Sequence, residues 1–235
     1  MMPWKKLISL PSNMGKTEHV LIIGTRPEVI KCAPLVEAFQ ERGARDRLTV
    51  IFSGQQNGLM DSARTAMEPD IRMDDWPHGD RLREQRTCMV HRTIEVLKNM
   101  HCGAHTKVIV QGDTSTSYFA ALAARSIGAR IFHVEAGLRS GSVSSPFPEE
   151  FNRRSISRMA HLHYAPNDGA KNNLLNEGVQ GSAILVTGNT GIDTVERIGM
   201  RTHLQRPDVV LITLHRQENR GRVVVAVLRA VQELA

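Results

Sequence analysis

The sequence predicts an α/β fold built on a doubly wound, mostly parallel sheet. Short aliphatic or β-branched runs alternate with amphipathic helical patterns along most of the 235 residues. Each run ends in Gly or a polar residue, as is typical of successive βα units. Because each helix must return the chain to the same edge of the sheet, this alternation places helices on both faces of parallel strands.

The first βα unit is the most clearly marked. Residues 19–23 are aliphatic and end at a glycine, which predicts a strand. Thr25 and Glu28 then have the spacing of a capping box, and Pro27 suits a first helical turn. We therefore expect a helix over residues 27–42.

The following segments repeat this alternation. Further strands are expected at residues 48–52, 107–110, 129–134, 161–165 and 183–186. Further helices are expected at residues 81–99, 116–127, 149–159 and 168–176. His161 and His163 are expected to line their strand on either side of a buried leucine. Four aspartates indicate a solvated loop: Asp70, Asp74, Asp75 and Asp80.

The helical and strand patterns weaken over residues 190–207, which we interpret as a connection between two domains. Residues 1–18 are then an N-terminal extension, and residues 19–189 form the first domain. Residues 208–235 contain one apolar strand and one helix. Since these two elements cannot cover their own apolar faces, we expect them to be the start of a truncated second domain.

The composition is that of an ordinary globular protein, with 41% hydrophobic and 23% charged residues. No apolar run approaches the roughly 20 residues of a membrane span, and the start does not resemble a signal peptide, so we expect a cytoplasmic protein without membrane contact. Cys32, Cys88 and Cys102 show no CxxC spacing. We interpret them as reduced thiols that serve packing.

The formal net charge of +6 favours an anionic partner. Lys and Arg are scattered and aromatic residues make up only 4%, which disfavours nucleic acid. No G-x-G-x-x-G follows the first strand, which disfavours tightly bound NAD, and no H-E-x-x-H or G-x-S-x-G motif is present. The sequence therefore predicts no cofactor and no metal.

In an open parallel sheet, ligands bind beyond the carboxyl ends of the strands, so residues in these positions are candidates for a site. After the first strand, Arg26, Lys31 and the amide groups of a helix N-terminus would favour a phosphate. The alternative is a well-capped helix that carries an exposed arginine.

Three carboxylates occupy comparable positions. Asp113 and Glu135 follow the strands at 107–110 and 129–134, and Glu149 opens a helix after a Gly- and Ser-rich loop. Carboxylates that crowd together at one edge are typical of acid–base chemistry. The alternative is that Glu149 only caps its helix and Asp113 only closes a turn.

Six segments together resemble the motifs of non-hydrolysing UDP-N-acetylglucosamine 2-epimerases, in the order of that family. They are GTRPEVIKCAPLV, VIVQGDTSTSYFAALAA, FHVEAGLRSG, SPFPEEFNRR, VTGNTGID and ITLHRQEN. The resemblance runs from about residue 19 to the end of the chain. Six motifs in order are far more specific than any one of them.

The resemblance implies a Rossmann-like catalytic domain that forms the N-terminal half of a two-domain architecture of the GT-B type. It implies interconversion of UDP-N-acetylglucosamine and UDP-N-acetylmannosamine for surface polysaccharide precursors. In that family UDP is eliminated to give an acetamido-glucal, and it adds again after C2 is protonated on the opposite face. No redox cofactor is implied.

Carried over by motif, Asp113, Glu135 and Glu149 would be the acid–base carboxylates. Asp113 and Glu135 would also contact substrate, together with Arg26 and Lys31, while His215 would contact the nucleotide. The chain departs from the family in having Gln55-Gln56 where a Gln-His pair is usual. Family members also continue with motifs that hold the uridine and diphosphate, so turnover by this chain alone is not assured.

Two other functions are left open at this point. One is a non-catalytic fragment that binds a nucleotide sugar or regulates a partner. The other is a hydrolysing epimerase or a glycosyltransferase with the same architecture. A homodimer, or a complex with a chain that supplies the missing C-terminal domain, is compatible with either.

Overall fold

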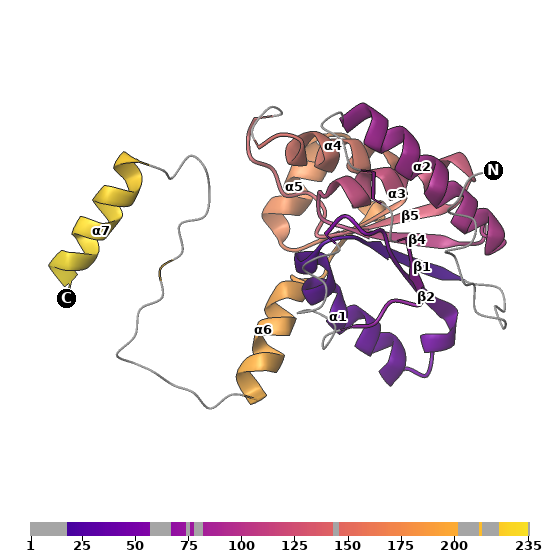
Figure 1. Cartoon of the computed structure of the whole chain (residues 1–235), viewed down its shortest axis with the longest axis horizontal. Helices are drawn as coiled ribbons and strands as arrows, with labels where there is room; N and C mark the ends of the chain where they lie inside the picture. Colours follow the sequence, from indigo (N-terminus) through magenta and orange to yellow (C-terminus); the bar gives the residue numbers. More distant parts are fainter. Residues whose placement is uncertain are drawn as a thin grey trace. The chain divides into compact units, whose positions relative to one another are not determined.

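A computed structural model describes residues 18–56, 67–73, 76–77, 82–142, 146–201, 212 and 221–234 (Figure 1). The chain divides into two compact units, Met1–Ile198 and Gly199–Ala235. The first unit contains the sheet, and the described part of the second contains the helix α7 (Arg222–Leu234). No helix within these described ranges has the length and apolar character needed to span a membrane.

The first unit is organised around a seven-stranded sheet in the order β3-β2-β1-β4-β5-β6-β7. Every neighbouring pair is parallel. The strands are β1 (His19–Ile23), β2 (Leu48–Phe52), β3 (Ile71–Arg72), β4 (Lys107–Gln111), β5 (Arg130–Val134), β6 (Leu162–Ala165) and β7 (Ile184–Val186). The strand order runs outward in both directions from β1 and β4, so the predicted doubly wound parallel sheet is confirmed.

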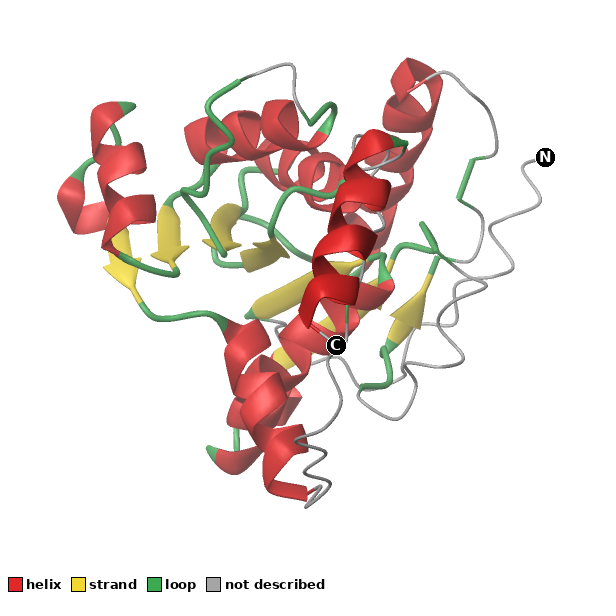
Figure 2. Ribbon diagram, turned by 90° about the vertical axis from the view of Figure 1, so that its left-hand side faces the viewer, coloured by secondary structure: helices red, strands yellow, loops and turns green. Residues whose placement is uncertain are grey.

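Helices cover both faces of this sheet (Figures 1 and 2). They are α1 (Arg26–Glu41), α2 (Leu82–Asn99), α3 (Ser115–Ser126), α4 (Glu149–Met159) and α5 (Asp168–Asn176), and a further helix, α6 (Thr190–Arg201), contacts α1. Helices α2, α3 and α4 share one core cluster with the sheet, whereas α1 packs on the opposite face. The order of the helices and strands from β1 to β7 follows the sequence prediction, apart from β3.

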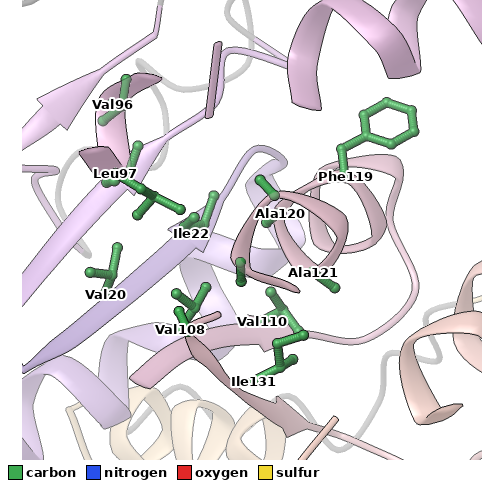
Figure 3. Packing of buried hydrophobic residues seen from close by; sticks show 14 of the residues in the cluster. Val20, Ile22, Val96, Leu97, Val108, Val110, Phe119, Ala120, Ala121 and Ile131 are labelled. Carbon is green, nitrogen blue, oxygen red and sulfur yellow. The ribbon is translucent and has the colours of Figure 1, made fainter. Parts of the chain in front are cut away.

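The larger core lies between the sheet and helices α2 and α3 (Figure 3). Val20, Ile22 and Val110 project from the strands and meet Leu97 of α2 and Ala120 of α3, all nearly or wholly buried. Alanines recur along α3 and allow its backbone to approach the sheet closely. Because each buried aliphatic side chain contributes roughly 1.5–3 kcal/mol, this layer is a principal source of stability.

The second core uses the alternate residues of the same strands. Leu21 and Phe52 pack against Val29, Cys32 and Val36 of α1, and all five side chains are buried or nearly so. Strands buried on both faces read as continuous apolar runs, which is why they were predictable. The three cysteines are free, and Cys32 is buried in this core.

Three local expectations differ from the structure. The helical pattern of the sequence weakens over residues 190–207, but α6 begins at Thr190. Thr194 Oγ1 donates to the carbonyl oxygen of Ile30 in α1, at 2.9 Å, and Arg197 forms an ion pair with Glu37. Two glycines weaken the helical pattern of α6, and contacts with α1 compensate for its low propensity.

The aspartate-rich loop also differs in part. Asp70 immediately precedes β3, a strand too short to show in the sequence pattern. Its carboxylate accepts from Arg45 Nη2 at 2.8 Å and from the Val50 amide at 2.7 Å, so it has a structural role. The other three aspartates, and the strand expected at 208–213 except for residue 212, lie outside the described residues.

The leucine between His161 and His163 was expected to be buried, and this was wrong. Leu162 is half-buried, whereas His163 is only 1% exposed. Side chains alternate between the two faces of a strand, and here it is the histidine that points into the interior.

Candidate functional site

A cavity of about 590 Å³ lies at the carboxyl ends of the central strands. Its walls come from the segments that follow β1, β2, β4 and β5, and from the first turns of α4. Strands β1 and β4 lie side by side, and the chain runs away from them in opposite directions. The cavity therefore occupies the switch point at which open α/β sheets bind their ligands.

The turn after β1 is fixed by the predicted capping box. Thr25 Oγ1 accepts from the Glu28 amide, and Glu28 Oε2 accepts from the amides of Gly24 and Thr25 at 2.9 and 2.8 Å. Glu28 Oε1 also accepts from Thr114 Oγ1, at 2.7 Å, in the turn after β4. Burial raises the pKa of the Glu28 carboxyl, which is only 1% exposed, while the hydrogen bonds from Thr114, Gly24 and Thr25 act in the opposite direction.

The segment after β2 joins the same network. Gln55 Oε1 accepts from the amide and hydroxyl of Thr116, at 3.1 and 2.8 Å, and Gln56 Oε1 accepts from the Arg26 amide at 3.1 Å. Ser53 Oγ lies 2.7 Å from Thr116 Oγ1. The side chain at the position of the family's histidine therefore satisfies an amide at the start of α1.

Glu135 is held in an unusual conformation directly after β5. Its φ of 61° lies in the left-handed region, which non-glycine residues rarely adopt. Lys31 Nζ donates to both carboxylate oxygens, at 3.0 and 2.8 Å, and Gln111 Nε2 donates to Oε2. These contacts aim the carboxylate along the cavity wall, and backbone strain of this kind gathers at functional sites.

Asp113 is held through both its side chain and its backbone. Arg153 Nη2 donates to Asp113 Oδ2, and Asn152 Nδ2 donates to the Asp113 carbonyl oxygen at 2.9 Å. The preceding carbonyl, of Gly112, lies 2.7 Å from Nε2 of the buried His133. The first turns of α4 and the end of β5 thus set the position of Asp113.

The two adjacent glutamates that open α4 lie in different surroundings. Glu149 lines the cavity and is half-buried, and no described residue forms a hydrogen bond or ion pair with its carboxylate. Glu150 is fully buried and accepts from Arg153 Nη1 at 2.8 Å and Arg154 Nε at 3.0 Å. Since consecutive helical residues point about 100° apart, only the first of the two reaches the cavity.

The structure brings together four of the six residues predicted for the site. Asp113, Glu135, Glu149 and Lys31 all line the cavity. Arg26 begins α1 at the same edge, but its side chain is exposed and does not line the cavity. His215 lies outside the described residues.

Among the cavity residues that the site prediction did not include are Gln111, Asn152 and Arg153. The motif SPFPEEFNRR contains the last two, but their chemical context depends on contacts with the β4 turn. Two cations and four carboxylates, Glu28 included, therefore line one polar cavity, an arrangement suited to proton transfer beside an anionic leaving group. Within the described part of the chain, no three His, Cys, Asp or Glu side chains converge as metal ligands would.

Comparison with known proteins identifies the family of this chain. A family model described as UDP-N-acetylglucosamine 2-epimerase matches residues 40–235. The chain belongs to this family. The UDP-N-acetylglucosamine 2-epimerase of Salmonella borreze is 35% identical over 234 residues, covering 92% of this chain. The enzyme of the same name from Bacillus subtilis strain 168 is 34% identical over 230 residues, covering 94% of this chain.

Solved structures of family members share the fold. The UDP-GlcNAc 2-epimerase of Neisseria meningitidis, bound to UDP-GlcNAc, superposes with a TM-score of 0.76 at 30% identity, covering 92% of this chain and 63% of that one. The Methanocaldococcus jannaschii UDP-GlcNAc 2-epimerase in complex with UDP-GlcNAc and UDP superposes with a TM-score of 0.70 at 30% identity. The match covers 79% of this chain and 51% of that one. The Rossmann-like fold predicted from the sequence is thus confirmed, and the structural neighbours are epimerases of the GT-B type.

The chain does not extend over the whole length of these family members. It spans 61% of the Salmonella borreze protein and 60% of the Bacillus subtilis protein. The cavity at the carboxyl ends of β1 and β4 is lined only by residues of the first compact unit.

Proposed function

We propose that this chain carries the sugar-binding and acid–base half of a UDP-N-acetylglucosamine 2-epimerase. The observation that supports the proposal is the convergence of Asp113, Glu135 and Glu149 on one cavity that also receives Lys31 and Arg153. In family members the substrate is UDP-N-acetylglucosamine, as the Neisseria meningitidis complex is named. Its epimer would be UDP-N-acetylmannosamine.

The reaction requires one proton to leave C2 and one to return on the opposite face. In the forward elimination, a carboxylate takes the C2 proton, the electron pair forms the C1–C2 double bond, and the C1–O bond to UDP breaks. Re-addition reverses these changes after C2 is protonated from the other side. Because two faces of the sugar must be served, several carboxylates around one cavity suit this chemistry.

The departure of UDP leaves negative charge that must be stabilised. The amides at the N-terminus of α1 lie beside the cavity, and a helix N-terminus favours anions. Lys31 and Arg153 add fixed positive charge in the cavity, and we assign Arg26 and His215 to the same task by their motifs. Preorganised groups of this kind stabilise a developing anion more effectively than water does.

Turnover in deuterium oxide tests the proposed function. UDP-N-acetylglucosamine is incubated with the chain alone, and with the chain plus the C-terminal portion of a related epimerase. We expect UDP-N-acetylmannosamine that carries deuterium at C2, because the returning proton comes from solvent-exchanged carboxyl groups. The matched control is the Asp113→Asn variant under the same conditions.

The products distinguish the other candidate functions. Free N-acetylmannosamine with UDP would identify a hydrolysing epimerase, and a transferred sugar would identify a glycosyltransferase. Binding of the nucleotide sugar without turnover in either format would identify a non-catalytic fragment. Retention of the original hydrogen at C2 would contradict elimination and re-addition.

A further inference from the structure

We propose that Glu150 is a positioning residue, which acts through Arg153 to hold the Asp113 carboxylate at the cavity. This inference rests on the proposed function, in which Asp113 exchanges a proton with the sugar. Glu150 does not line the cavity, and its side chain is 0% exposed. It therefore cannot contact a substrate directly.

Arg153 connects the two carboxylates. Its Nη2 donates to Asp113 Oδ2, and its Nη1 donates to Glu150 Oε2 at 2.8 Å. Arg153 lines the cavity, but its side chain is only 14% exposed, so it is largely removed from water. Because the planar guanidinium of Arg153 is bound at both ends, it has little freedom to rotate. It therefore fixes the orientation of the Asp113 carboxylate.

Glu150 is itself held from other directions. Arg154 Nε donates to its Oε1 at 3.0 Å, and the Ser140 amide donates to its Oε2 at 3.3 Å. Arg154 in turn donates from Nη1 to Glu177 Oε1, at 2.8 Å. Residues three and four positions after Glu150 lie over it on the helix, so the register of α4 places both arginines on one buried anion.

The backbone of Asp113 has a separate support. Asn152 Nδ2 donates to the Asp113 carbonyl oxygen at 2.9 Å, and this contact does not involve Glu150. Neutralising Glu150 should therefore leave the turn after β4 in place, and only the side chain of Asp113 should become free to change its orientation. The expected signature is a loss in kcat with little change in KM.

The test compares two isosteric variants, Glu150→Gln and Glu177→Gln, in the form of the protein that turns over UDP-N-acetylglucosamine. Both remove one negative charge from the arginine network of α4, but Glu177 contacts Arg154 and Arg139 and touches neither Arg153 nor the cavity. We expect kcat to fall about 100-fold in Glu150→Gln, the scale of a misplaced catalytic group. We expect kcat to stay close to wild type in Glu177→Gln.

The Asp113→Asn background separates positioning from a general structural effect. If Glu150 acts through Asp113, adding Glu150→Gln to Asp113→Asn lowers the residual rate no further. An equal loss in both backgrounds would overturn the inference, as would an unchanged kcat in Glu150→Gln. If instead wild type shows no turnover, or Asp113→Asn is fully active, the proposed function itself fails.

Two further measurements keep the inference testable when Glu150→Gln folds poorly or no turnover is found. Arg153→Lys tests the same connection from its other end, because one ammonium group cannot bridge both carboxylates; we expect a comparable loss in kcat. Crystal structures give a readout independent of activity. We expect the Arg153 guanidinium to leave Asp113 in Glu150→Gln and to stay in Glu177→Gln, and the opposite result would contradict the proposal.

Discussion

Glu135 combines a strained backbone with a paired carboxylate. Its left-handed φ turns the chain sharply at the end of β5, and Lys31 and Gln111 hold its side chain. An L-residue in this conformation costs roughly 1–2 kcal/mol relative to the right-handed region. Since a glycine would avoid this strain, the glutamate at this position lowers the stability of the fold.

Because of this strain, we expect glycine to be more stable than alanine at position 135, which reverses the usual order of these two residues. Both Glu135→Gly and Glu135→Ala remove the carboxylate, so both should lose epimerisation. We expect the glycine variant to be the more stable of the two by about 1 kcal/mol, because only glycine adopts this φ freely. Urea denaturation measures the difference in the free energy of unfolding.

The neighbouring residue provides the control. Val134 lies within β5, where glycine is usually less stable than alanine by roughly 0.5–1 kcal/mol. Val134→Gly should therefore be less stable than Val134→Ala. The same order at positions 134 and 135 would contradict the assignment of strain to Glu135.

The sequence alone identified only some of the residues that line the cavity. The pair Glu149-Glu150 marks an acidic start to α4, but only the structure separates the residue that faces the cavity from the buried one. The sequence likewise contains no sign that Arg153 joins Asp113 to Glu150. Such pairings depend on which turns meet, and that is decided by contacts between distant segments.

At the scale of elements, hydrogen bonds join the turns after β1, β2 and β4 to one another. Gly24 lies at their junction, beside the paired hydroxyls of Ser53 and Thr116. A Cβ atom at position 24 would come within 2.1 Å of both hydroxyl oxygens. This close approach accounts for the glycine that begins the first motif.

Gly24→Ala should therefore destabilise the chain by about 1–3 kcal/mol, the usual range for overpacking a buried site, and should weaken binding of UDP-N-acetylglucosamine. Urea denaturation and calorimetric titration measure the two effects. Gly103→Ala is the matched control, because a Cβ atom there meets nothing within 4 Å. Equal losses of stability in the two variants would show that crowding at Gly24 is not the cause.

The helix α6 marks the limit of sequence patterns at this scale. Its glycines reduce helix propensity, and the bonds from Thr194 to Ile30 and from Arg197 to Glu37 occur only when α1 is in place. By contrast, the capping box at Thr25 and Glu28 is local, so the start of α1 was predictable within one residue.

Across the whole first unit, two buried histidines lie on adjacent strands of the sheet. His133 and His163 are 0% and 1% exposed, and they are paired in the register of β5 and β6. Burial lowers the pKa of His133 to about 3 and that of His163 to about 4. Both side chains are therefore neutral in the folded protein at neutral pH.

These histidines predict a loss of stability in mild acid. Below about pH 6.5 the unfolded chain binds protons at these residues, whereas the folded chain does not until the pH approaches 4 and then 3. Above pH 6.5 these histidines do not change the free energy of unfolding. Below that pH, His133 lowers the free energy of unfolding by about 1.4 kcal/mol per pH unit. Urea denaturation between pH 7 and 4.5 measures the slope.

The variant His133→Gln should reduce this slope, because glutamine does not titrate. Replacing the exposed His91 of α2 in the same way controls for the loss of one histidine and should leave the slope unchanged. A wild-type slope in His133→Gln would show that other groups cause the acid sensitivity.

The sequence by itself determined the order of most strands and helices, the parallel sheet and the family, and it predicted three of the carboxylates that line the cavity. These features follow from local periodicity, caps and short motifs, which each segment carries independently of its neighbours. The tertiary structure alone decided the strand order 3-2-1-4-5-6-7, the helix α6 and the network that joins Asp113 to Glu150. The physical reason is that ion pairs and burial depend on which distant segments pack together, and packing sums many weak contacts that no single segment encodes.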